Sequence, residues 1–130
     1  MSMRTTVYCR YMIKGEYSMK RVEAIIRPSK LEDIKDALKS SNINGVTISQ
    51  VMGCGQQRGW KEYHRGTEIT TNVLPKIEVK IVVEDDKVEE VIELITSIAR
   101  TGEVGDGKIF IVDIAECIRI RTGERGNSAL

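Results

Sequence analysis

The chain has 130 residues, with 20 basic and 19 acidic side chains and a formal net charge of +1. It therefore lacks the general positive field that attracts nucleic acid or an anionic membrane surface, and its length suits one domain with a real core. Three widely spaced cysteines, Cys9, Cys54 and Cys117, argue against a disulfide framework or a zinc site. No apolar run approaches the roughly 20 residues that cross a bilayer, and no signal peptide is evident. We expect a cytoplasmic protein without a nucleic-acid partner or direct membrane insertion.

The first predicted elements are a strand and a helix. Residues 1–18 show no regular period and are expected to form a flexible extension, which leaves 19–130 as the folded domain. Apolar residues alternate from Val22 to Ile26, which predicts a strand that ends at Pro28. Ser29 and Glu32 have the spacing of a capping box, and the apolar positions that follow predict a helix ending before Asn42 and Gly45.

The rest of the chain predicts three more strands and a second helix. Residues 46–51 and 77–83 alternate as strands, Asp86 with Glu89 suggests a second capping box, and 88–99 form an amphipathic stripe that predicts a helix. A fourth strand is predicted at 109–114. The order β-α-β-β-α-β predicts an α+β, ferredoxin-like fold, with an antiparallel sheet that carries both helices on one face. Apolar residues on both sides of the last strand predict self-association over the other face.

Residues 53–75 form a long polar connection between the second and third strands. Connections of this length are usually functional or disordered, so we expect an arm that reaches a partner. His64, the only histidine, is interpreted as a polar contact rather than a metal ligand or base. Cys54 and Cys117 are interpreted as packing residues. Trp60 is either a partner contact or a side chain that folds back over the base of the loop.

The run TGEVGDGK, from Thr101 to Lys108, is the strongest candidate for chemistry. Its glycines would let the backbone fold closely around an anion. In a strand, Arg119 and Arg121 would share one face, with Ile118 and Ile120 turned to the core. This pattern predicts a nucleotide phosphate site, although such a run is more often a plain glycine turn. It is not a Walker sequence, because Lys108 is not followed by Ser or Thr.

Several motifs together resemble the P-II nitrogen regulatory proteins. They are EAIIRPSKLEDIKDAL, GCGQQRG, YHRGTE, LPKIEV, RTGEVGDGKIF and IRIRTGERG, and they extend over most of residues 19–130. The resemblance implies a non-catalytic homotrimer that binds ATP or ADP, and 2-oxoglutarate, in clefts between its subunits. It also implies regulation of an ammonium transporter or a nitrogen-metabolism enzyme or regulator.

The resemblance also assigns roles to individual residues. The nucleotide-binding positions that it implies are Thr47, Gly53, Gly55, Gln57, Thr101, Gly105, Asp106, Gly107, Lys108, Arg119 and Arg121. Those implied for 2-oxoglutarate are Arg27, Gln57 and Lys76, and Gln57 would also hold Mg²⁺ between the nucleotide and the keto acid. Octahedral oxygen coordination suits such a shared ion. Trp60 and Arg65 would contact partners.

The loop departs from the family pattern at its tip. Many relatives carry a tyrosine that is uridylylated three residues after the Arg-Gly pair, where this chain has Ile69. Isoleucine cannot be uridylylated, so no modification is expected there. Thr67 stands where some relatives carry a phosphorylated serine, which is a weak signal. Direct sensing of effectors is therefore the expected mechanism.

Two other classes of function remain open. A small enzyme could use Lys76, Lys108, Arg119 and Arg121 to stabilise charge on the γ-phosphate of ATP, but no base or water-positioning acid is evident. A structural trimer of the related metal-tolerance type would share the fold and need neither Gln57 nor the arginine pair. Nucleotide binding distinguishes this last class from the sensor.

Overall fold

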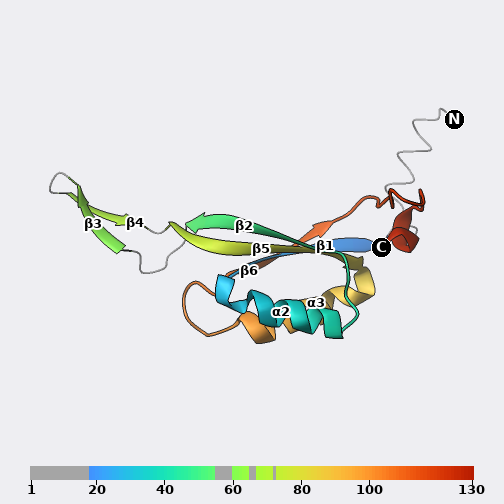
Figure 1. The fold of residues 1–130 in the computed structure, drawn as a ribbon, viewed down its shortest axis with the longest axis horizontal. Helices are drawn as coiled ribbons and strands as arrows, with labels where there is room; N and C mark the ends of the chain where they lie inside the picture. The colour runs from blue at the N-terminus through green and yellow to red at the C-terminus, as the bar shows by residue number, and fades with distance from the viewer. Residues whose placement is uncertain (1–17, 55–59, 65–66, 72) are drawn as a thin grey trace, which may run out of the picture.

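A computed structural model describes residues 18–54, 60–64, 67–71 and 73–130, with side chains outside 55–72. Figure 1 shows a sheet seen nearly edge-on with both helices on one side of it. The strands are β1 (Met19–Ile26), β2 (Val46–Cys54), β3 (Trp60–His64), β4 (Thr67–Thr71), β5 (Val73–Glu84) and β6 (Lys108–Asp113). The α-helices are α2 (Leu31–Ser40) and α3 (Val88–Ala99), and short 3₁₀ helices cover Pro28–Lys30, Asp85–Lys87 and Gly126–Ala129.

The main sheet has the strand order β2-β5-β1-β6, and every neighbouring pair is antiparallel. This order confirms the predicted ferredoxin-like arrangement. Strands β3 and β4 form a separate antiparallel pair within the chain that joins β2 to β5. The central strands β1 and β5 have a neighbour on each side, so the core is built around them.

One face of the sheet packs against the helices. The buried residues of β1 and β5 alternate along each strand, as the period of a strand requires. Helix α2 contributes Ile34 and Leu38, and α3 contributes a stripe that starts at Val88 and ends at Ala99. The core cluster consists of Val22, Ala24, Ile26, Ile34, Leu38, Ile43, Ile77, Val79, Ile81, Val83, Val88, Val91, Ile95 and Ala99. The predicted helix faces are thus confirmed.

Both helices begin differently from the prediction. A 3₁₀ turn that starts at Pro28 leads directly into α2, so Ser29 lies inside helical backbone and no side chain caps the helix. The same holds for α3, where the turn starts at Asp85 and takes in Asp86. The two predicted capping boxes are wrong, because a capping side chain needs an extended residue just before the first turn.

The end of α2 is fixed by a Schellman motif. Asn42 adopts a positive φ of 57°. Its N–H donates to the Lys39 carbonyl at 3.1 Å, and the N–H of Ile43 donates to the Leu38 carbonyl at 2.9 Å. These bonds satisfy carbonyls that the helix leaves unpaired, and buried Ile43 anchors the turn in the core. The predicted end of this helix is therefore confirmed in physical detail.

The connection at 53–75 contains more regular structure than its polar sequence suggests. The ladder between β2 and β5 continues as far as Cys54, which lies opposite Val73. In the sequence between these two residues, β3 and β4 pair with each other. Pairing along extended backbone needs no apolar face, so polarity alone was a poor guide. Part of the predicted arm at 53–75 is thus a strand pair, and its contact with a partner stays a prediction.

Within the described residues, no helix covers the second face of the sheet. On β6, Phe110 lies opposite Glu23 on this face and is half exposed. Arg21 and Glu23 lie on the same face and form an ion pair, with 2.6 Å between Arg21 Nε and Glu23 Oε1. An exposed aromatic side chain beside paired charges is typical of a surface that meets another protein. In the part of the chain with described structure, no helix is long and apolar enough to cross a membrane.

Candidate functional site

The glycine loop, Thr101–Lys108, joins the end of α3 to β6 at one end of the sheet. Gly102, Gly105 and Gly107 all have positive φ, at 88°, 104° and 102°. At Gly107 a Cβ atom would lie 1.7 Å from the carbonyl oxygen of Ile25. The backbone of the loop thus lies directly against the end of β1, and only glycine fits there.

Asp106 holds the two ends of the glycine loop together. One carboxylate oxygen accepts the N–H groups of Thr101 and Gly102 at 2.8 and 2.9 Å, and the other accepts the Thr101 hydroxyl at 2.5 Å. The Thr101 hydroxyl and amide, helped by the Gly102 amide and Arg27, lower the pKa of the Asp106 carboxyl to about 2. The loop is therefore closed by an ionised aspartate, and Asp106 is occupied within the chain.

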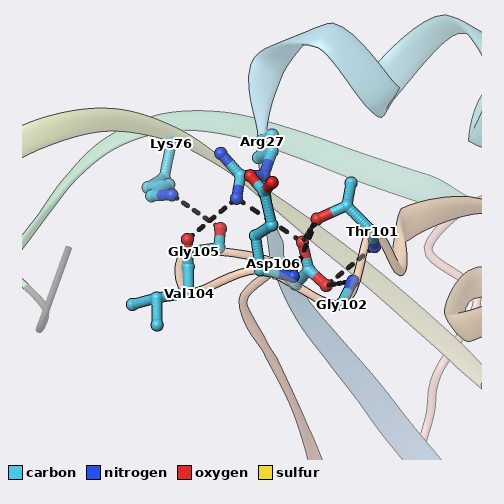
Figure 2. A network of polar contacts seen from close by, with 8 residues as sticks. Arg27, Lys76, Thr101, Gly102, Val104, Gly105 and Asp106 are labelled. Atoms are coloured by element: carbon cyan, nitrogen blue, oxygen red, sulfur yellow. Dashed lines mark hydrogen bonds and ion pairs between the residues drawn. The ribbon is translucent and has the colours of Figure 1, made fainter. Parts of the chain in front are cut away.

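Arg27 and Lys76 reach the same loop from two strands, as Figure 2 shows. Arg27, just after β1, donates to the Val104 carbonyl at 2.9 Å and lies 3.5 Å from the Asp106 carboxylate. Lys76, on β5, donates from Nζ to the Gly105 carbonyl at 2.9 Å. Residues that are far apart in sequence are thus brought to one small region.

Lys76 is a nearly buried cation, with 9% of its surface exposed. Burial lowers the pKa of its ammonium group, and the positive charge of Arg27 lowers it further, although Asp106 acts in the opposite direction. Gly53, on β2, leaves room beside its stem, since a Cβ there would lie 3.2 Å from Lys76 Cγ. A neighbouring anion would offset the unfavourable environment of the charge.

The arginine pair, Arg119 and Arg121, which was predicted to form the phosphate site together with the glycine loop, lies far from that loop within the chain. The glycine loop precedes β6 and the arginine pair follows it, so the two lie beyond opposite ends of that strand (Figure 1). Residues 118–125 form a tight turn, closed by one bridge between Ile118 and Arg125. Within this turn the Gly123 N–H donates to the Arg119 carbonyl at 2.7 Å.

The predicted strand geometry of the arginine pair is wrong. Ile118 is 50% exposed and Ile120 is 99% exposed, so neither side chain faces the core. Arg119 contacts Glu124 at 3.2 Å and donates to the terminal carbonyl of Leu130 at 2.9 Å. A strand alternates its faces regularly only when a neighbouring strand holds it extended, and in the described part of the chain this segment makes one bridge. Sequence reasoning missed Glu124, which the turn at Gly123 brings opposite Arg119.

The structure describes the other predicted residues to different extents. Thr47 is exposed on β2, opposite Lys80 and away from the glycine loop. Gly55, Gln57 and Arg65 lie outside the described residues. Trp60, Thr67 and Ile69 lie in β3 and β4, whose backbone pairing alone is described. Cys54 is exposed and Cys117 is partly buried, so the packing role predicted for Cys54 is not seen within the chain.

A cavity of about 330 Å³ borders the other side of the glycine loop. Its walls are mainly aliphatic and include Ile26, Ile95 and Ile109, which belong to the helix-covered side of the sheet. Arg27 and Lys76 do not line it. The charged residues Arg100, Asp106 and Lys108 do line it, so the cavity and the polar network meet at the glycine loop.

Comparisons with known proteins agree with this geometry. The family profile "Nitrogen regulatory protein P-II" matches residues 19–124. Similar proteins include "Nitrogen regulatory protein P-II 1" of Methanothermobacter thermautotrophicus, 49% identical over 87% of this chain and 98% of the relative. The P-II protein of Microchaete diplosiphon is 52% identical over 86% of this chain and its own full length, and "Nitrogen regulatory protein GlnK" of Escherichia coli K12 is 46% identical with the same coverage.

The match starts at residue 19, where β1 begins, and includes the glycine loop and both arginines of the pair. Proteins of this family transmit signals and are not enzymes, which confirms the expectation of a non-catalytic regulator and weighs against the ATP-hydrolysing alternative. The resemblance drawn from the sequence motifs is likewise confirmed. The chain belongs to the P-II nitrogen regulatory protein family, and it is a signal transducer in nitrogen regulation.

Proposed function

We propose that this P-II protein is a cytoplasmic homotrimer that binds ATP or ADP, and 2-oxoglutarate, between its subunits. It would report their levels to a target protein through the loop at 53–75. The observation that carries the proposal is the convergence of Arg27 and Lys76 on the glycine loop. Residues 19–130 form the sensing domain, and residues 1–18 precede it.

The pair Arg27 and Lys76 favours an anionic ligand. Asp106 is the carboxylate bonded to Arg27, and its oxygens are shared with Thr101 and Gly102. Lys76 has three N–H donors, and among the described residues they make a single hydrogen bond. A nearly buried ammonium group with donors to spare is stabilised by a carboxylate. A dicarboxylate such as 2-oxoglutarate matches two neighbouring cations.

The glycine loop favours phosphate on its other side. The Val104 and Gly105 carbonyls point toward Arg27 and Lys76. Because a trans peptide places its N–H opposite its carbonyl, the N–H groups of Gly105 and Asp106 point away from the two cations. Consecutive backbone N–H groups in such a loop form an anion-binding concavity. This geometry supports Gly105, Asp106, Gly107 and Lys108 as phosphate ligands.

A complete nucleotide site needs a second subunit. Arg119 and Arg121 lie beyond the far end of β6 from the glycine loop, so one chain does not bring them to the same phosphate. A cyclic homotrimer would place the arginine pair of one subunit beside the glycine loop of its neighbour. The half-exposed Phe110 on the uncovered sheet face supports association over that face. Thr47, also on that face, would then approach the nucleoside.

Mg²⁺ would be held mainly by ligand oxygens. The described residues contain no group of three side chains suited to a metal ion. Asp106 is already engaged by the glycine loop, so its carboxylate is a poor additional ligand. Phosphate oxygens, the keto-acid oxygens and the Gln57 amide oxygen would together suit the octahedral preference of Mg²⁺. Gly53 and Gly55 would allow the backbone near Gln57 to approach the nucleotide.

The loop at 53–75 would convert occupancy into a signal. Lys76 follows it directly and Gln57 lies within it, so filling the site would shift the population of loop conformations. Trp60 and Arg65 would contact the target, an ammonium transporter or a nitrogen-metabolism enzyme or regulator. Ile69 excludes uridylylation at the usual position, and Thr67 is a weak candidate for phosphorylation. Effector binding itself would thus control the loop.

Calorimetry on the full-length protein tests the proposal. ATP with Mg²⁺ is titrated first, 2-oxoglutarate is titrated second, and Trp60 fluorescence is followed in parallel. We expect nucleotide binding, keto-acid binding that requires ATP, and a change in Trp60 emission. Light scattering should give three subunits per particle. Nucleotide binding without a keto-acid response would leave an adenylate sensor, whereas no nucleotide binding would favour the structural trimer.

A further inference from the structure

Both cations of the proposed keto-acid site are bonded to the backbone of the proposed phosphate loop. Lys76 Nζ donates to the Gly105 carbonyl, and an Arg27 terminal nitrogen donates to the Val104 carbonyl, each at 2.9 Å. Figure 2 shows the two side chains reaching the loop from the same side. These consecutive carbonyls are therefore held by one side chain from β5 and one from the residue that follows β1.

The bonds fix the orientation of two peptide groups. Gly105 has a φ of 104°, a region that glycine enters readily, so its flanking peptides could rotate between several arrangements. Charge-assisted bonds to both carbonyls select one arrangement, because each would be lost if its peptide turned over. In that arrangement the N–H groups of Gly105 and Asp106 face away from the cations, where phosphate is proposed to bind.

We infer that Lys76 and Arg27 are positioning residues for the nucleotide, in addition to the keto-acid role proposed above. They prepare the glycine loop for phosphate before any keto acid is present. This inference rests on the proposed function, since it assigns a new task to residues of the same site. Asp106 closes the two ends of the loop, while Lys76 and Arg27 set the direction of its peptides.

The arrangement also accounts for an order of binding. While the loop is empty, a keto acid that draws the Lys76 ammonium group toward itself would strain the bond to the Gly105 carbonyl. Once phosphate oxygens hold the N–H side of the loop, its conformation no longer depends on Lys76. The Lys76 ammonium group can then bind a carboxylate with less disordering of the glycine loop. The nucleotide therefore improves keto-acid binding, and thermodynamic linkage requires the converse.

The test uses ADP alone, without keto acid or Mg²⁺. Lys76→Met keeps the length of the side chain but cannot donate to Gly105. Loss of a charge-assisted hydrogen bond predicts about tenfold weaker ADP binding by calorimetry. Lys35→Met, which removes a half-exposed lysine on α2, is the matched control and should change affinity less than about twofold. Arg27→Met provides a second variant and should also weaken ADP binding.

Two readouts separate positioning from simple charge attraction. The Gly105 carbonyl-carbon resonance of the ligand-free protein should shift in Lys76→Met and stay in place in Lys35→Met. The loss of ADP affinity should persist at about 1 M salt, where long-range attraction is screened. Circular dichroism confirms that each variant is folded.

The outcomes distinguish the inference from the proposed function. Equal ADP affinity in wild type, Lys76→Met and Arg27→Met would overturn the inference and leave the nucleotide site intact. An affinity loss that disappears at high salt with an unmoved Gly105 resonance would also overturn it. If the wild-type protein does not bind ADP, the proposed function itself fails.

Discussion

The two halves of the proposed phosphate site are built in opposite ways. The glycine loop is bonded to two other parts of its own chain, Arg27 just after β1 and Lys76 on β5, and Asp106 ties its two ends together. The C-terminal segment, residues 117–130, is held near Arg119 mainly by local bonds, and Ile120 at its turn is 99% exposed. The first half is prepared within one subunit. The second half leaves Arg121 exposed, where another subunit can use it, while Arg119 is bonded to Glu124 of its own chain.

This contrast indicates which half tolerates change. A loop fixed by close backbone contact has little freedom to relax, so substitutions there should disturb folding as well as binding. An exposed turn with local bonds should tolerate substitution without loss of fold, and its changes should appear mainly in ligand binding.

Gly107→Ala should have the largest effect. Its Cβ would meet the Ile25 carbonyl oxygen at 1.7 Å, and its φ is 102°, so the loop must move away from β1. We expect a loss of about 3 kcal/mol or more in the free energy of unfolding, measured by urea denaturation. Gly102→Ala is the matched control, with a φ of 88° and open space around it, and should lose only about 1–2 kcal/mol. Equal losses would refute a special contact at Gly107.

Asp106→Asn should have the next largest effect, and it should depend on pH. The pKa of Asp106 is lowered from 3.8 to about 2, so the ionised carboxylate stabilises the folded state above pH 3.8. That contribution is lost as the pH falls through about 2. The difference in stability between wild type and variant should therefore shrink over this range. Carboxyl-carbon NMR should give a midpoint near 2 for Asp106, and a midpoint near 3.8 would contradict the clamp.

The sequence predicted the glycine loop and most of the fold because their signals are local. Alternation in β1 and β5 and the stripe from Val88 to Ala99 each reflect one element against one core. Arg27 and Lys76 entered only through the resemblance to a family, since they are far apart along the chain and only the folded sheet brings them to one loop. The strand geometry of Arg119 failed for the opposite reason, because local alternation was present without a neighbouring strand to enforce it.

Arg121→Ala should leave the fold nearly unchanged and weaken nucleotide binding. Arg121 lies exposed in the turn, so the free energy of unfolding should change by less than about 0.5 kcal/mol. Loss of a phosphate contact should reduce ATP affinity by about ten- to a hundredfold. Mixed trimers provide a sharper check. Arg121→Ala subunits combined with subunits disabled by Lys108→Ala should regain some intact sites, because the two residues would come from neighbouring subunits.

Glu124→Gln should have the smallest effect on the fold, and it should strengthen ATP binding, whereas Arg121→Ala should weaken it. The ion pair between Arg119 and Glu124, at 3.2 Å, is solvent-exposed, and exposed pairs contribute only about 0–1 kcal/mol. Phosphate must compete with this carboxylate for Arg119, so removing its charge should strengthen ATP binding by up to about fivefold. Calorimetry at low salt measures the gain, and the gain should fall as salt screens the pair. Weaker ATP binding in Glu124→Gln would show instead that Glu124 orients Arg119 for the phosphate, which would make the C-terminal segment as prepared as the glycine loop.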